Sequence, residues 1–171
     1  MNVAGAPLLS CRGVSKHFGA LAAVRDLSFD VWPGEVLGIG GPNGAGKTTL
    51  FDVISGLNPA SSGDIMFNGQ SIVRLAPERI CHAGIARTFQ LNAGFDSLTV
   101  LENVLVAAYY GHANRVVPGL RIDLSTRRRA EEALALVGLA GKAEEITKDL
   151  PVLDRKLLML ATALATEPTL L

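Results

Sequence analysis

Hydrophobic and polar positions alternate with a short period in the first part of this chain. Apolar or β-branched runs begin at Leu8 ("LLSCRGV"), Leu21 ("LAAVRDLSFDV") and Glu35 ("EVLGIG"), separated by Gly, Pro and charged residues. Runs of this kind are typical of strands, so we predict strands over 8–14, 21–31 and 35–40. Asn68-Gly69 divides "DIMF" from "QSI". Because both residues tolerate positive φ, the pair predicts a hairpin.

From Pro77 onward the apolar positions follow helical spacing instead. Thr99 and Glu102 form a T-x-x-E capping box ahead of "VLENVLVAAYY", which predicts that a helix begins there. A second helix is predicted by i, i+3, i+4, i+7 spacing at Ala130, Ala133, Leu134 and Val137. Residues 111–125 between these helices are interpreted as a loop. We therefore expect a helical subdomain over 92–150.

Composition narrows the range of partners and compartments. The chain has 171 residues, of which 49% are hydrophobic, and its 16 Lys+Arg balance its 16 Asp+Glu. A chain without net positive charge does not favour an electrostatic hold on nucleic acid. Two unpaired cysteines suit a reducing, cytosolic setting. With no signal peptide and no spanning apolar run in the sequence, we expect the protein to act from the aqueous side of any membrane it serves.

The strongest chemical signal is "GPNGAGKT" from Gly41 to Thr48, which fits G-x-x-x-x-G-K-[ST] in full. Glycines in this pattern let the backbone curl until successive N–H groups point at phosphate oxygens, and the following helix presents its positive end to the same anion. Lys47 would contact the β- and γ-phosphates, and the Thr48 hydroxyl would bind Mg²⁺. A glycine-rich turn that binds nothing is the competing interpretation. The complete match, between a predicted strand and a predicted helix, favours a nucleoside triphosphate.

Small-molecule kinases, GTPases and transport ATPases all share this motif, so three further features are needed. Thr49 extends it to "GPNGAGKTTL", "SKHFGALAAVRDLSFDVWPGE" precedes it, and "GIARTFQ" follows it. With these in register the chain resembles the ATP-binding subunit of ABC transporters, from Leu8 to Leu171. The run "ARTFQ" followed by "DSLTVLENVLVAAYYGH" is most similar to the branched-chain amino-acid importer group. A soluble P-loop kinase is disfavoured because "RTFQ" and the tail helix would have no role in it.

The resemblance implies an α/β fold, in which a P-loop core sheet carries an N-terminal antiparallel β-subdomain and a helical subdomain. It implies ATP and Mg²⁺ as cofactors. Phe18 would stack on adenine, although taken alone it would be interpreted as a core residue, and Val24 would pack against the base. Gln90 would bind Mg²⁺ and orient water. The implied nucleotide-binding residues are Phe18, Val24, Gly41, Pro42, Asn43, Gly44, Ala45, Gly46, Lys47, Thr48 and Thr49, and the implied metal ligands are Thr48 and Gln90.

The tail departs from the family at one place. Where the resemblance implies a Leu-Ser-Gly-Gly-Gln signature before the last helix, this chain has "LPVLD" from Leu150 to Asp154. Pro151 has no N–H, and Val152 and Leu153 carry Cβ atoms where close backbone approach is needed. Asp154 adds a negative charge. We expect this surface to contribute poorly to a partner's nucleotide site.

As a function, the resemblance implies an ATP-hydrolysing subunit that energises a membrane importer, for branched-chain amino acids. It would pair with a second ATP-binding subunit, identical or not, and with transmembrane permease subunits at the cytoplasmic face of the plasma membrane. A strand beginning at Thr169 would carry the catalytic acids of the family, which lie beyond Leu171. We therefore expect a single ABC-type domain, 1–171, that is incomplete. The alternative is a non-catalytic ATP-binding fragment that cannot hydrolyse ATP by itself.

Overall fold

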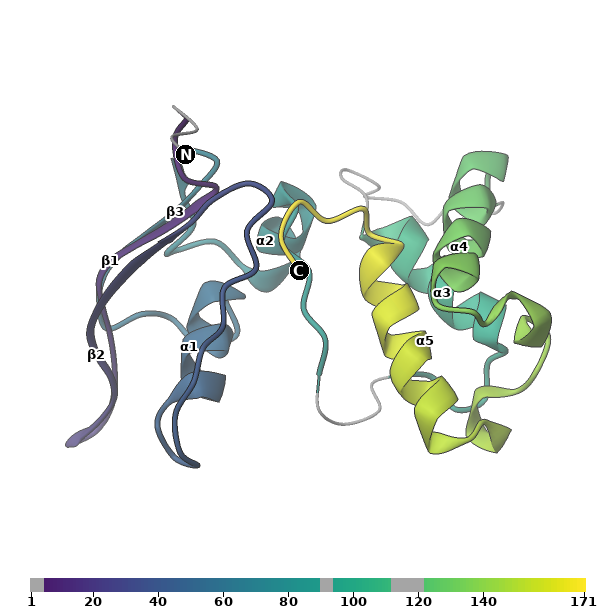
Figure 1. Cartoon of the computed structure of the whole chain (residues 1–171), viewed down its shortest axis with the longest axis horizontal. Helices are drawn as coiled ribbons and strands as arrows, with labels where there is room; N and C mark the ends of the chain where they lie inside the picture. Colours follow the sequence, from purple (N-terminus) through teal and green to yellow (C-terminus); the bar gives the residue numbers. More distant parts are fainter. Residues whose placement is uncertain (1–4, 90–93, 112–121) are drawn as a thin grey trace. The chain divides into compact units, whose positions relative to one another are not determined.

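The computed structural model describes residues 5–89, 94–111 and 122–171. The chain divides into two compact units, 1–80 and 81–171. Figure 1 shows the helices and strands of both units.

The first unit is built on a four-stranded antiparallel sheet with strand order β2-β1-β3-β4. The strands predicted from Leu8 and Leu21 are confirmed, as is the Asn68-Gly69 hairpin, whose two residues have φ of 47° and 75°. The strands are β1 (Leu9–Phe18), β2 (Leu21–Val31), β3 (Ser62–Phe67) and β4 (Gln70–Ser71).

The core of this unit lies between the sheet and the helix α1 (Lys47–Ile54), which packs beside it in Figure 1. Successive strand side chains point to opposite faces, and the inner face is mainly apolar, with Lys16 as a buried exception. Each fully buried Val, Leu, Ile or Phe side chain contributes about 1.5–3 kcal/mol. The buried apolar residues include Leu9, Cys11, Val14, Leu50, Val53, Ile65 and Phe67.

The strand predicted over 35–40 is not formed. In the described part of the chain these residues belong to no sheet, and Val36 and Leu37 are 97% and 41% exposed. The segment leaves β2 through a turn in which Glu35 N–H donates to Trp32 O at 3.1 Å and Gly34 has φ of 76°. An apolar run becomes a strand only when a neighbour accepts its backbone hydrogen bonds, and no described residue does so here.

The second unit is a helical bundle of α3 (Val100–Tyr110), α4 (Leu124–Leu136) and α5 (Val152–Leu164). The division between the two units, after residue 80, falls within the short helix α2 (Pro77–Ala83). Two 3₁₀ turns lie at Ala140–Lys142 and Thr147–Asp149. The predicted capping box is present, because Thr99 Oγ1 accepts from Glu102 N–H and Glu102 Oε2 accepts from Thr99 N–H. None of the helices in the described ranges has the length and apolarity that crossing a bilayer requires.

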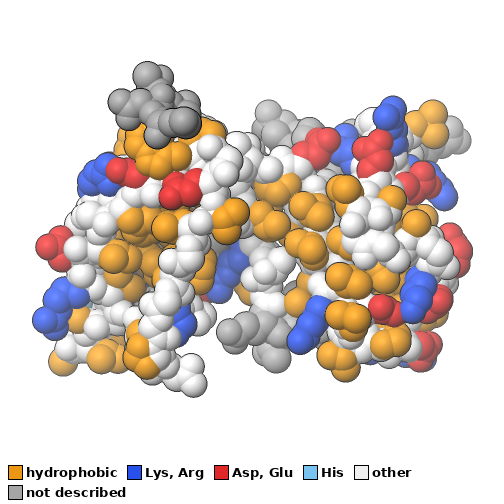
Figure 2. All heavy atoms as spheres, viewed as in Figure 1, with side chains coloured by type: hydrophobic (Ala, Val, Ile, Leu, Met, Phe, Trp, Pro, Cys, Tyr) orange, Lys and Arg blue, Asp and Glu red, His pale blue; other side chains and the backbone are white. Residues whose placement is uncertain are grey.

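The core of the bundle is shared by all three helices. Leu158, Ala161 and Ala165 pack into the same cluster as α3 and α4, so the helical packing continues past the range 92–150. Figure 2 shows hydrophobic side chains gathered over the face of this unit that carries α5 in Figure 1. Of the predicted loop 111–125, residues 112–121 lie outside the described residues, and its last two residues belong to α4.

The end of the chain pairs with the segment after α2 through its backbone. Leu170 forms a parallel bridge with Ile85. Ala86 N–H donates to Leu170 O at 2.9 Å, and Leu170 N–H donates to Gly84 O at 3.0 Å. Because this is an isolated bridge outside any strand, the strand at Thr169 stays a prediction. The structure has the α/β class that the sequence predicts.

Candidate nucleotide-binding site

The P-loop is a stretch of irregular backbone that runs directly into α1. Gly44 and Gly46 both have φ of 83°, in the left-handed region that favours glycine. Gly46 is the N-cap of α1, and no side chain caps this end of the helix. The first N–H groups of a helix have no partner within it. The loop therefore presents N–H donors and the positive end of a helix dipole at one place, which suits an anion.

Lys47 supplies the positive charge at this loop. Its Nζ donates to the carbonyl oxygens of Gly41 and Pro42, both at 2.7 Å. These two bonds hold the ammonium over the curl of the loop, beside the helix N-terminus. Such an arrangement can neutralise a phosphate with a cation and backbone donors together.

The loop is fixed to β2 by a very close contact at Gly46. One step along β1, from Lys16 to His17, corresponds to two steps along β2, from Val24 to Ala22. Ala23 is thus the extra residue of a β-bulge. A Cβ built on Gly46 would lie 2.0 Å from Ala23 O, so only glycine fits. The bulge therefore seats the P-loop against the sheet.

Phe18 and Val24 lie on the strands next to the loop. Phe18, at the end of β1, is 48% exposed and is not a core residue. Val24 is buried, and its Cγ2 lies 3.6 Å from the position that a Gly46 Cβ would take. The structure thus places Val24 directly beside the P-loop. Contact of either side chain with a base stays a prediction.

The remaining P-loop residues form an exposed rim. Ala45 N–H donates to Pro42 O at 3.2 Å, which closes a tight turn over Asn43 and Gly44. All four residues of this turn, from Pro42 to Ala45, are exposed. Thr49 is half-buried as α1 begins, and Leu50 anchors the helix in the core.

A Mg²⁺ ion bound with a nucleotide has one candidate protein ligand in the described residues, Thr48. Its side chain is exposed in the first turn of α1, beside Lys47. A hydroxyl here fits a metal that takes most of its ligands from phosphates and water. Gln90, the other predicted ligand, lies outside the described residues. Across the described ranges, no three His, Cys, Asp or Glu side chains gather as a metal-binding cluster.

The "LPVLD" segment forms the start of α5 and differs from an anion site in its chemistry. Pro151 is the N-cap, without a side-chain cap, and Val152 and Leu153 are 69% and 66% exposed. Asp154 does not project as a free charge, because it accepts from Lys142 Nζ and forms an ion pair with it. The hydrogen bond that Lys142 donates to Asp154 raises the pKa of Lys142.

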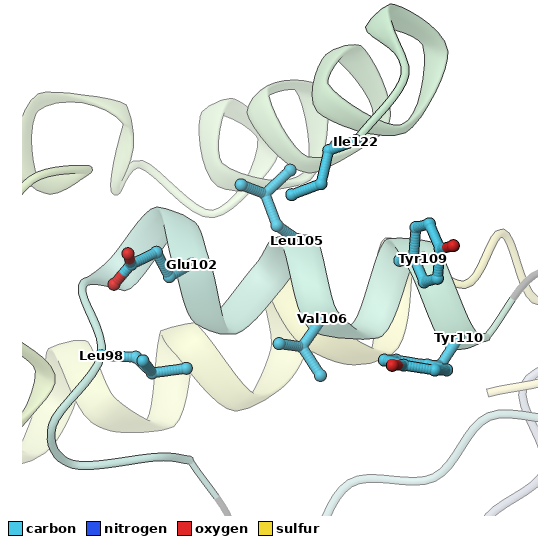
Figure 3. Close-up of a pocket in the computed structure, with 7 residues that line it drawn as sticks. All are labelled: Leu98, Glu102, Leu105, Val106, Tyr109, Tyr110 and Ile122. Atoms are coloured by element: carbon cyan, nitrogen blue, oxygen red, sulfur yellow. The ribbon is translucent and has the colours of Figure 1, made fainter. Parts of the chain in front are cut away.

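A hollow lies on α3 (Figure 3). It has a volume of about 310 Å³. Among the described residues that line it, Glu102 alone is charged, and its carboxylate is already engaged in the capping box. Phosphates need cations and N–H donors, so this hollow does not suit a nucleotide. Its lining residues are Leu98, Glu102, Leu105, Val106, Tyr109, Tyr110 and Ile122.

Comparison with known proteins identifies the family of this chain. A family model described as "ABC transporter" matches residues 24–171. The chain belongs to the ABC transporter family. It is 34% identical over 172 residues to the high-affinity branched-chain amino acid transport ATP-binding protein LivG of Escherichia coli, covering 96% of this chain and 68% of that protein.

Other members of the ABC transporter family match over similar parts of the chain. The ribose import ATP-binding protein RbsA 1 of Streptomyces coelicolor is 33% identical, with 99% of this chain and 33% of that protein covered. An ATP-binding cassette of an ABC transporter in its ADP conformation superposes with a TM-score of 0.84 at 29% identity, with 96% and 66% covered. The chain thus spans about two thirds of the length of LivG and of this structure.

Sequence reasoning missed one charged residue close to the predicted site. Lys16 is only 8% exposed, and its Nζ lies 4.9 Å from the centroid of the Phe18 ring. Two residues apart on a strand, they share a face of the sheet. The K-x-F spacing just beyond the predicted strand 8–14 was the available signal for this pair.

Proposed function

We propose that this chain is an ATP-binding subunit that energises solute import across a membrane, with branched-chain amino acids as the solute class. The observation that carries the nucleotide part is the P-loop geometry. Left-handed glycines, an uncapped helix N-terminus and the Lys47 ammonium converge on one exposed loop. The chemistry of this loop fits the triphosphate of a nucleotide better than any other concave surface described.

ATP and Mg²⁺ would be held by residues with separate tasks. The P-loop backbone and Lys47 bind the β- and γ-phosphates, and Thr48 binds the metal, which neutralises phosphate charge. Phe18 and Val24 offer apolar surface to the adenine, with Phe18 stacking on it. Gln90 orients water for the ATP hydrolysis that the ABC family couples to transport. Hydrolysis depends on such positioning and charge stabilisation more than on ground-state binding.

Importer function and the solute class rest on similarity. LivG and RbsA 1 are both named as import or transport ATP-binding proteins. Their identities to this chain are close, 34% and 33%, so the choice of branched-chain amino acids rests on the resemblance carried by "ARTFQ" and "DSLTVLENVLVAAYYGH". We propose a second ATP-binding subunit and transmembrane permease subunits as partners, and a peripheral position on the cytoplasmic side of the membrane. In a reconstituted transporter, stimulation of ATPase activity by leucine but not by ribose would support this solute class, and the reverse result would overturn it.

Lys47→Ala tests nucleotide binding most directly. Hydrogen bonds to charged groups contribute about 1.5–3 kcal/mol each. We expect ATP affinity to fall by about ten- to a hundredfold when measured by calorimetry. Lys156→Ala removes an exposed lysine of α5 in the other unit and serves as the control. Equal affinities in the wild type and Lys47→Ala would refute the proposed phosphate site.

A second candidate function is an ATP-binding subunit that gives its partner no phosphate contact. The observation that favours it is the start of α5, where two exposed apolar side chains and a neutralised Asp154 replace hydrogen-bond donors. In an assembled pair of subunits, replacing "LPVLD" by "LSGGQ" would then raise ATPase activity. An unchanged rate would exclude this candidate.

A further inference from the structure

Lys16 is a buried cation on the face of the sheet that carries Phe18 and Val24. It lies directly opposite Val24 in the β1–β2 ladder and two residues before Phe18. Only 8% of the residue is exposed. Its ammonium donates to Pro59 O at 2.8 Å and lies 4.9 Å from the centroid of the Phe18 ring.

Burial of an ammonium is costly unless other groups replace its water. Here a carbonyl oxygen and the electron-rich face of an aromatic ring take that role. The contact also acts on the ring. Phe18 ends β1 and is 48% exposed, so a cation fixed over one face limits the orientations that the ring adopts and leaves the opposite face for a flat ligand.

We infer that Lys16 is a positioning residue for the nucleotide base. Its ammonium, anchored by Pro59 O, holds the Phe18 ring from one side so that the ring offers its other side to adenine. The inference rests on the proposed stacking of adenine on Phe18. It assigns to Lys16 no contact with the nucleotide, so its effect should pass entirely through Phe18.

A purely structural role is the competing explanation. Pro59 belongs to the connection between α1 and β3, and this connection is tied to β1 in two further places. Ser61 N–H donates to Ser15 O at 2.8 Å, and Ser61 Oγ accepts from His17 N–H at 3.0 Å. Lys16 could therefore serve only to hold this connection. Ser61→Ala loosens the same connection without touching Phe18, and it is the matched control.

The test compares a ligand with a base and a ligand without one. Affinities for ATP and for inorganic tripolyphosphate are measured by calorimetry on the wild type, Lys16→Met, Lys16→Arg and Ser61→Ala. A cation–π contact of this kind corresponds to an affinity change of about fivefold. We expect Lys16→Met to weaken ATP binding by that factor and to leave the affinity for tripolyphosphate unchanged. Lys16→Arg, which keeps a cation, should bind ATP like the wild type, and so should Ser61→Ala.

Phe18→Leu completes the test as a double-mutant cycle. In the Phe18→Leu background, Lys16→Met should have no further effect on ATP. Persistence of the fivefold loss there would overturn the inference, as would a parallel loss of tripolyphosphate or a similar loss in Ser61→Ala. If Phe18→Leu weakens ATP and Lys16→Met does not, only the role of Lys16 fails. If Phe18→Leu leaves the affinity for ATP unchanged, both the proposed stacking and the role of Lys16 fail.

Discussion

The P-loop in the first unit and the segment before α3 in the second unit are held in place by different kinds of interaction. In the first unit the P-loop is exposed, carries no side-chain cap and takes its shape from glycine backbone. In the second unit the segment before α3 is held by one buried side chain, Asn103. Its amide accepts from Phe95 N–H at 2.7 Å and donates to Phe95 O, Thr99 O and Thr147 Oγ1 at 3.1, 2.9 and 2.9 Å.

This difference has a physical basis in what each segment does. A loop that binds phosphate must keep its N–H donors available, so it cannot satisfy them with its own side chains. A segment that supports a helical bundle has no such requirement, and a buried amide with all its partners fixes it firmly. We therefore expect substitutions in the P-loop to act through backbone sterics and substitutions at Asn103 to act through unpaired polar groups.

Gly46→Ala should have the largest effect of the substitutions considered. The new Cβ would lie 2.0 Å from Ala23 O, in a residue with φ of 83°. The clash with backbone and the left-handed strain together should destabilise the first unit by about 3 kcal/mol. Urea unfolding followed by Trp32 fluorescence measures this, since Trp32 is the chain's single tryptophan and lies in the first unit.

Gly44→Ala is the matched control, because Gly44 has the same φ of 83° but nothing within 4 Å of its Cβ position. The free energy of unfolding of Gly44→Ala should fall only by the strain of an alanine in the left-handed region, about 1 kcal/mol. Equal losses in the two variants would show that the contact with the β2 bulge does not hold the P-loop. Helical circular dichroism, which reports mainly on the second unit, should be unchanged in both.

Asn103→Leu should give the next largest effect, this time in the second unit. Asn103 is 3% exposed, and leucine would leave Phe95 N–H and its other partners without the amide. A loss of about 2–3 kcal/mol is expected for unpaired buried groups. The unfolding midpoint by circular dichroism should fall, while Trp32 fluorescence and ATP affinity stay as in the wild type.

Thr147→Val removes one of the four bonds and should cost about 1 kcal/mol. A loss as large as that of Asn103→Leu would mean that the Thr147 hydroxyl, rather than the amide, is the main support. A fall in ATP affinity in Asn103→Leu would instead show that the second unit affects nucleotide binding by the first.

The same contrast explains what could be predicted from the sequence. The P-loop, the Asn68-Gly69 hairpin and the Thr99–Glu102 capping box depend on residues within a few positions of each other, and their spacing carries the information. Asn103 could not be recognised, because its partner Thr147 is distant in the chain. The strand prediction for 35–40 was wrong for a related reason. The apolar pattern of these residues indicates a strand, but a strand forms only with hydrogen-bond partners from elsewhere in the chain.

The smallest expected effect is on the pH dependence of stability, and it differs between the two cysteines, of which each unit has one. Cys11 in β1 is fully buried, and burial raises the pKa of its thiol from 9.0 to about 12, with Arg12 lowering it and Asp30 raising it to smaller extents. Cys81 in the second unit is only half-buried, and burial raises its pKa as well. Folding therefore favours the protonated thiol, most strongly at Cys11.

Because the folded pKa of Cys11 lies above the unfolded one, its contribution to stability is complete below pH 9 and declines as pH rises toward 12. Between pH 9 and 10 the stability of the wild-type first unit should fall by about 1 kcal/mol more than that of Cys11→Ala. Urea unfolding by Trp32 fluorescence at the two pH values measures this difference, and the other titrating groups cancel because both proteins carry them. Cys81→Ala should show no such difference by the same probe. Parallel pH dependence in the wild type and Cys11→Ala would mean that the Cys11 thiol ionises as readily in the folded sheet as in the unfolded chain, and the tight packing of β1 between β2 and β3 would have to be reconsidered.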